Sequence, residues 1–120
     1  MSNELLNKKC VPCEGGLPPL SHEEIEKMMP QVPGWNLAEE QSENLQKFGM
    51  GATISKEYKF KDFIGAINFV NKVAEIAEGE GHHPDIQINY NKVKLTHSTH
   101  AIGGLSENDF ILAAKIDASK

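Results

Sequence analysis

Histidine supplies the chain's clearest chemical signal, because four of the five histidines lie between positions 82 and 100. His82 and His83 are adjacent, and His100 follows after a predicted turn. A neutral imidazole accepts a proton and an imidazolium donates one, both near neutral pH. Three clustered histidines could therefore hold an acid and a base together. The pattern predicts a site for proton transfer.

A predicted hairpin of two strands, residues 85–90 and 93–100, would bring these histidines together. Apolar and polar residues alternate in both strands, as in strands with one buried face. With the turn centred just after Asn91, Ile88 faces Leu95 and the apolar residues fall on one side. This register is self-consistent, because a slip of one residue would turn the apolar set to the opposite face.

The same register predicts where each histidine lies. It places His83 opposite His100, with Cβ atoms about 5 Å apart in a regular ladder. His82 is the next residue along the chain. We therefore predict that these three side chains converge at one end of the hairpin. His97 falls on the apolar face, which favours a packed or partly buried side chain.

A metal site is the alternative interpretation of these residues. Three histidines can bind catalytic zinc with water in the fourth position. Adjacent histidines such as His82 and His83 are poor co-ligands on a strand, because successive side chains point to opposite faces. The single pair Cys10 and Cys13 supplies half of a structural zinc site. It could form a clip completed by His22 or another chain, or be two reduced thiols, which we favour.

The remaining elements must position the hairpin. Residues 1–20 hold the two cysteines among several prolines and glycines, which predicts a separate arm. The motif from Ser21 to Glu24 matches a capping box, so a short helix should begin there and end near Pro30. Residues 35–60 are mostly extended and predict a first strand pair, with Trp35 as a core anchor.

Residues 61–79 carry the clearest helical pattern, and Gly79-Glu-Gly81 should end the helix. Its apolar positions cover about half the circumference, more than one sheet face requires. We expect the excess, centred on Phe69 and Ile76, to form a subunit contact. A second capping box, from Ser106 to Asp109, precedes a closing helix.

The predicted order of elements is α-ββ-α-ββ-α. It indicates an α+β fold in which a four-stranded, largely antiparallel sheet carries the helices on one face. The chain has 120 residues, which suits a single domain over residues 21–120 after the arm over residues 1–20.

Composition excludes several classes of protein. The net charge of −5 argues against direct binding to nucleic acid, which requires a basic surface. No apolar run approaches the roughly 20 residues of a membrane span. The chain shows no targeting segment and holds only two cysteines, so we expect a soluble cytoplasmic protein that does not bind membranes.

Three segments together resemble the pterin-4a-carbinolamine dehydratase family. They are Glu80-Gly-His-His-Pro-Asp85, then Asn91-Lys-Val-Lys94, and then Thr96-His-Ser-Thr-His100 with its continuation through Leu105-Ser-Glu-Asn-Asp-Phe110. The resemblance runs from about Ser21 to Asp117. The arm segment Lys9-Cys-Val-Pro-Cys-Glu-Gly-Gly16 is similar to that of plant-type members.

The resemblance implies a set of site residues. The family's three active-site histidines fall on His82, His83 and His100, and its supporting acidic residues fall on Glu78 and Asp109. Members often have Asp immediately before the histidine pair. Gly81 stands there in this chain, and Glu80 could substitute from one position earlier.

The resemblance also implies an activity. The family removes water from 4a-hydroxytetrahydropterin during tetrahydrobiopterin recycling and uses no metal or organic cofactor. We expect His82 or His100, when protonated, to donate to the leaving hydroxyl while a neutral partner accepts a ring proton, and His83 mainly to bind substrate. The family forms homodimers and homotetramers through its long helix. The alternative function is a non-catalytic oligomeric adaptor, because some animal members serve as dimerisation partners of a transcription factor.

Overall fold

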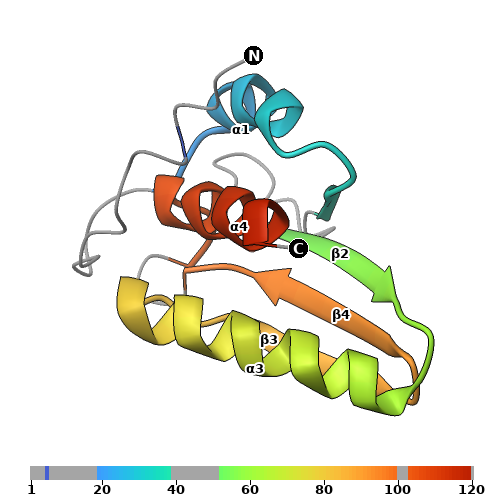
Figure 1. Cartoon of the computed structure of the whole chain (residues 1–120). Helices are drawn as coiled ribbons and strands as arrows, with labels where there is room; N and C mark the ends of the chain where they lie inside the picture. The colour runs from blue at the N-terminus through green and yellow to red at the C-terminus, as the bar shows by residue number, and fades with distance from the viewer. Residues whose placement is uncertain (1–4, 6–18, 39–51, 100–102, 120) are drawn as a thin grey trace.

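The computed structural model describes residues 5, 19–38, 52–99 and 103–119, and it confirms the predicted α+β order (Figure 1). A short 3-10 turn, η2, follows the first helix. The elements are α1 (His22–Met28), η2 (Met29–Gln31), β1 (Asn36–Ala38), β2 (Thr53–Lys59), α3 (Phe63–Glu80), β3 (Asp85–Asn89), β4 (Lys92–His97) and α4 (Glu107–Ser119).

The strands form one antiparallel sheet in the order β1-β2-β4-β3. Along β4, the buried positions alternate with exposed or half-buried ones, so one face of the sheet carries the core. Helices α3 and α4 lie side by side over that face (Figure 1). The core therefore lies between the sheet and this helical layer. Its buried members include Ile54, Tyr58, Ala66, Phe69, Val73, Val93, Leu95, Phe110, Leu112 and Ile116.

Local hydrogen bonds explain where two of the helices begin. The predicted capping box of α1 is confirmed, because Ser21 Oγ accepts from the backbone of Glu24 and the Glu24 side chain accepts from Ser21 N. Asp62 caps α3 by accepting a 2.8 Å hydrogen bond from Gly65 N. Both caps satisfy backbone donors that have no partner inside the helix.

Helix α3 buries more of its apolar surface in the core than we predicted. Phe69 is 6% exposed, and its ring lies 4.6 Å from Tyr58 and 5.0 Å from Phe60 between centroids. Ile76 is partly buried against the same core. The prediction of a subunit contact through Phe69 is therefore wrong, because the long aromatic side chains of β2 and the segment after it reach far enough along α3 to cover this residue.

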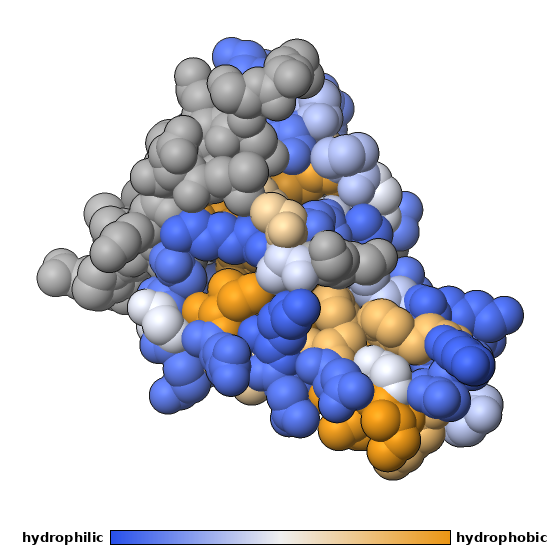
Figure 2. All heavy atoms as spheres, viewed as in Figure 1, coloured by the Kyte–Doolittle hydropathy of each residue, from blue (hydrophilic) through white to orange (hydrophobic). Residues whose placement is uncertain are grey.

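Exposed apolar side chains instead gather at the start of α3 and along β3. Ile64 and Tyr90 are each 65% exposed, and Phe63 is 48% exposed. Figure 2 shows hydrophobic atoms at the lower right of the molecule, where α3 begins.

The register of the second hairpin differs from the prediction by two residues. Ile88 pairs with Val93 and Ile86 with Leu95, so the two turn residues are Tyr90 and Asn91. The predicted face of each side chain survives, because a shift of two residues preserves the alternation of a strand.

A contact from outside the hairpin accounts for this register. The Asn91 side chain donates to Phe60 O at 3.0 Å, and Asn91 O accepts from Phe60 N at 2.7 Å. Asn91 is thereby held against the segment between β2 and α3. The register therefore could not be predicted from the turn preferences of the hairpin residues alone.

The predicted arm over residues 1–20 is described only at residues 5, 19 and 20. Leu5 is 1% exposed and belongs to the core, and Leu20 N donates to Leu105 O at 2.8 Å. Cys10 and Cys13 lie outside the described residues. In the described part of the chain, every helix is too short or too polar to cross a membrane.

Candidate active site

A buried carboxylate, that of Asp109, is the centre of the candidate site. Asp109 is 0% exposed and lies in the first turn of α4. Its Oδ1 is 2.6 Å from Nε2 of His82, while its Oδ2 accepts from Thr99 Oγ1 at 2.8 Å and from Ser106 N at 3.0 Å. Three donors around one carboxylate offset the cost of burying its charge.

The end of α3 brings His82 to this carboxylate. Gly81 adopts a left-handed conformation, with φ of 68°, and closes the helix as predicted. His82 N then donates to Ala77 O at 3.2 Å, which holds the backbone of His82 against the last turn. The His82 side chain is 12% exposed, so it is mostly enclosed but still reaches the surface.

The contact with Asp109 determines which nitrogen of His82 carries a proton. A carboxylate accepts hydrogen bonds, so Nε2 of His82 is the donor. Within the described part of the chain, Nδ1 of His82 makes no hydrogen bond. Asp109 therefore orients the ring through Nε2, and Nδ1 is the nitrogen that remains for contact with another molecule.

His83 faces a different carboxylate from its neighbour. Its Nε2 is 2.6 Å from Glu78 Oε1, and the two side chains are 60% and 79% exposed. Such an exposed pair contributes little to stability, because water screens both charges. The structure therefore separates the adjacent histidines into an enclosed one on Asp109 and an exposed one on Glu78.

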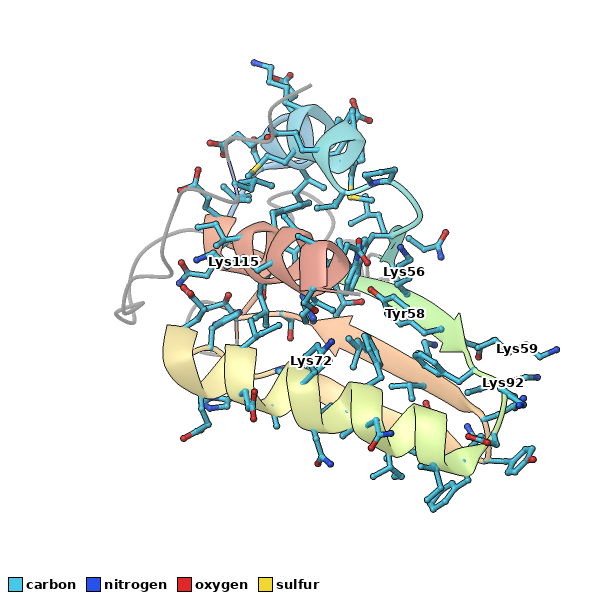
Figure 3. The ribbon with its side chains drawn as sticks, in the orientation of Figure 1. Lys56, Tyr58, Lys59, Lys72, Lys92 and Lys115 are labelled. Atoms are coloured by element: carbon cyan, nitrogen blue, oxygen red, sulfur yellow. The ribbon has the colours of Figure 1, made fainter. Side chains whose placement is uncertain are left out.

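Glu80 points to α4. Its Oε2 is 2.8 Å from Lys115 Nζ, and the side chains are 14% and 18% exposed (Figure 3). This ion pair joins the last residue of α3 to α4, the helix that carries Asp109. Glu80 thus contributes to the arrangement of the two helices that hold His82 and Asp109.

His97 is buried on the apolar face, as the alternation predicted. Its Nδ1 donates to the backbone carbonyl of Asp109 at 3.1 Å. Burial lowers the pKa of His97 to about 4, because a charged imidazole loses its hydration in the core. The ring is therefore neutral near pH 7.

One partner of Asp109, Thr99, was not predicted from the sequence. The Thr99 hydroxyl donates to Asp109 Oδ2. Its position two residues after His97 on the inward face was the available signal. The second capping box did identify Ser106, whose N donates to the same oxygen.

The third predicted histidine, His100, lies outside the described residues. The observed hairpin register, continued past Asp85 and Thr96, sets position 83 opposite position 98 instead of position 100. The pairing of His83 with His100 lies beyond the described ladder and stays a prediction. Among the described residues, no three side chains of His, Cys, Asp or Glu form a group that could hold a metal ion.

A second carboxylate, that of Asp117, ties the other end of α4 to the sheet. It accepts from Trp35 Nε1 at 2.8 Å, Tyr58 OH at 2.7 Å and Lys56 Nζ at 3.2 Å (Figure 3). Burial and the hydrogen bond to Asp117 raise the pKa of Tyr58, so its hydroxyl stays protonated. Trp35 is a core anchor, as predicted, and is 5% exposed.

Solved structures with related folds were found for this chain. The crystal structure of a transcriptional coactivator/pterin dehydratase from Brucella melitensis is 31% identical, with a TM-score of 0.67, and the match covers 83% of this chain and 96% of that one. A pterin dehydratase-like protein described as a RuBisCO assembly factor in the alpha-carboxysome is 20% identical, with a TM-score of 0.52 over 69% of this chain and 87% of that one. The second likeness shows the fold alone.

Proteins of similar sequence show to which family the chain belongs. Three bacterial relatives are each named as a pterin-4-alpha-carbinolamine dehydratase. The protein of Nitrosospira multiformis is 51% identical over 96% of this chain and 91% of its own length. The proteins of Halorhodospira halophila and Rubrobacter xylanophilus are 46% and 42% identical, and cover 95% and 96% of this chain and 95% and 97% of their own lengths. The profile of the family described as pterin 4 alpha carbinolamine dehydratase matches residues 18–119. The chain thus belongs to the pterin-4-alpha-carbinolamine dehydratases, a family of hydro-lyases.

Proposed function

We propose that this protein dehydrates 4a-hydroxytetrahydropterin to quinonoid dihydropterin by histidine acid–base catalysis, the reaction that returns the cofactor of aromatic hydroxylation to its recycling route. The observation that carries the proposal is the pair of His82 with the buried carboxylate of Asp109. The family and its relatives supply the pterin substrate class.

The reaction needs two proton transfers. The bond between C4a and the hydroxyl oxygen breaks, and that oxygen takes a proton from an acid and leaves as water. The ring nitrogen N5 supplies the electron pair that forms the C4a–N5 double bond, and a ring proton passes to a base. Each positioned transfer contributes about 10² to 10⁴ in rate. Because N5 itself drives out the hydroxyl, the step requires no Lewis acid.

His82 suits one of these transfers. Asp109 holds Nε2 and fixes the orientation of the ring, while Nδ1 is the nitrogen that can reach a bound pterin. We assign the second transfer to His100, and substrate binding to His83 with Glu78. Asp109 supports His82, and Glu80 supports the site through Lys115. Which of His82 and His100 is the acid follows from the pH dependence of their variants.

The test is a spectrophotometric assay of 4a-hydroxytetrahydropterin loss, with wild type, His82→Ala, His100→Ala and the control His22→Ala. His22 lies on α1, and its side chain is 51% exposed. We expect each of the first two variants to lose at least about tenfold in rate, and His22→Ala to match wild type. Near-normal rates in both His82→Ala and His100→Ala would contradict the proposal, and chelator treatment with metal analysis tests the zinc alternative.

An adaptor role is the second candidate. The exposed apolar side chains Phe63, Ile64 and Tyr90 favour it, because large exposed apolar patches mark contact surfaces. The assay separates the two functions: an adaptor without activity leaves the loss of 4a-hydroxytetrahydropterin at its spontaneous rate. An active enzyme can still use this surface for self-association.

A further inference from the structure

The imidazole of His97 lies at a buried core position of β4, where an apolar side chain is usual. It is the third inward position of β4, after Val93 and Leu95, and all three are 0% exposed. A polar ring in such a place loses its hydration, which is unfavourable unless its nitrogens find partners. A valine or leucine would satisfy the core alone. A specific contact of the ring should therefore explain the histidine.

Only one ring nitrogen is satisfied. Nδ1 donates to the backbone carbonyl of Asp109 at 3.1 Å, so Nδ1 carries the proton. Nε2 is consequently a bare acceptor, and it is buried without a hydrogen-bond partner in the described part of the chain. The hydrogen bond from Nδ1 to Asp109 is therefore the polar contact that offsets the cost of burying Nε2 without a partner.

That bond ends on the residue whose carboxylate holds His82. His97 at the end of β4 and Thr99 just beyond it thus hold Asp109: the His97 ring donates to the Asp109 carbonyl, and the Thr99 hydroxyl donates to Asp109 Oδ2. Ser106 N also donates to Oδ2, and Oδ1 accepts from His82 Nε2. The backbone of Asp109 is fixed by His97 and its carboxylate by Thr99 and Ser106, so the direction of Oδ1 is fixed too.

We propose that His97 is a positioning residue, which acts through its Nδ1–H on the backbone of Asp109 and thereby aims Oδ1 at His82. The catalytic consequence rests on the function proposed above, whereas the positioning itself is a property of the structure. Small errors in the placement of a proton-transfer group are costly, and a shift of about 1 Å can reduce a rate by about 10²-fold.

The charge state of the ring supports this role. Burial lowers the pKa of His97 to about 4, and the nearby charged groups are Asp109, His82 and Asp117. A neutral His97 does not compete with His82 for the negative charge of Asp109. His82 therefore has Oδ1 to itself across the pH range in which the dehydration would run.

Space filling is the alternative explanation, because the His97 ring lies 4.5 Å from that of Trp35. Two variants separate it from the proposal. His97→Leu removes both the ring and the donor, whereas His97→Asn removes the ring but places an amide N–H where Nδ1–H stood. Ile25→Val in α1 is the control, since Ile25 is fully buried but belongs to neither β4 nor α4.

The first measurement does not depend on activity. In ¹⁵N-histidine-labelled protein, the Nε2–H proton of His82 on Asp109 should give a downfield resonance that is protected from exchange. We expect His97→Leu to broaden or lose this signal, and His97→Asn and Ile25→Val to retain it. An unchanged signal in His97→Leu, or equal loss in His97→Leu and His97→Asn, would overturn the proposal.

The second measurement is the dehydration assay. We expect His97→Leu to lower kcat by about tenfold with KM nearly unchanged, and His97→Asn to restore most of it. Equal kcat values in His97→Leu and wild type would overturn the catalytic consequence. If wild type shows no activity while the His82 resonance still depends on residue 97, the proposed function fails and the positioning role stands.

Discussion

At the scale of single residues, the two adjacent histidines differ in the carboxylate that each one contacts. His82 lies on buried Asp109 and His83 on exposed Glu78, although the two are neighbours in the sequence. An enclosed carboxylate fixes and polarises its imidazole, whereas an exposed one is screened by water. This difference is the reason for assigning proton transfer to His82 and binding to His83.

His97 should make the stability of the protein depend on pH. Its pKa is lowered to about 4 in the folded state, against about 6.5 in an unfolded chain. The unfolded state therefore binds a proton first as the pH falls, and the free energy of unfolding decreases between pH 6.5 and 4. Above pH 6.5 His97 is neutral in both states, so this loss of unfolding free energy is absent there. In His97→Leu it should be absent, a difference on the order of 3 kcal/mol across that range.

Urea unfolding of wild type and His97→Leu at pH 7, 6, 5 and 4 would measure this difference. The two free-energy curves should converge or cross as the pH falls, because only wild type loses the contribution of residue 97. The exposed His22 provides the control, through His22→Ala. Parallel curves for wild type and His97→Leu would contradict the expected titration.

At the scale of elements, the end of α3 decides where His82 lies. Gly81 has φ of 68°, and a Cβ there would meet no atom within 4 Å. Any cost of a side chain at this position is therefore backbone strain alone. The left-handed turn both ends the helix and sends the chain towards β3, which places His82 beside α4.

Gly81→Ala should destabilise the protein by about 1 kcal/mol and lower the dehydration rate, because alanine disfavours the left-handed region. Gly81→Asn should cost less, since asparagine tolerates this conformation better. Gly79→Ala is the matched control: the space around Gly79 is also open, and alanine favours the helix by about 0.5–1 kcal/mol. Thermal unfolding and the assay check the three variants, and an equal effect of alanine at both positions would contradict the argument.

At the scale of the whole molecule, two carboxylates lock α4 onto the sheet. The Asp109 carboxylate contacts Thr99, just beyond the end of β4, and the Asp117 carboxylate contacts β2 and Trp35. The helix that carries the support of His82 is thus held at both ends. A rigid platform of this kind keeps a proton-transfer group in place without substrate.

The predicted homo-oligomer also belongs to this scale. Phe69 is committed to the core, so the contact should use exposed apolar residues such as Ile64, which is 65% exposed. Ile64→Glu should lower the oligomer's mass in size-exclusion chromatography with light scattering, because it places a charge in a desolvated contact. Glu78→Gln is an exposed control on the same helix. A monomeric wild type, or an unchanged mass in Ile64→Glu, would contradict this prediction.

The sequence by itself determined the order of the elements, the N-cap of α1, the glycine that ends α3, and the inward position of His97. These features depend on hydrogen bonds within a few residues and on the period of apolar positions, which are local. The tertiary structure alone decided the hairpin register, through the contact of Asn91 with Phe60, and the burial of Phe69. It also decided that Asp109 bonds to His82, His97 and Thr99, because residues far apart in the chain meet only when the helices pack on the sheet.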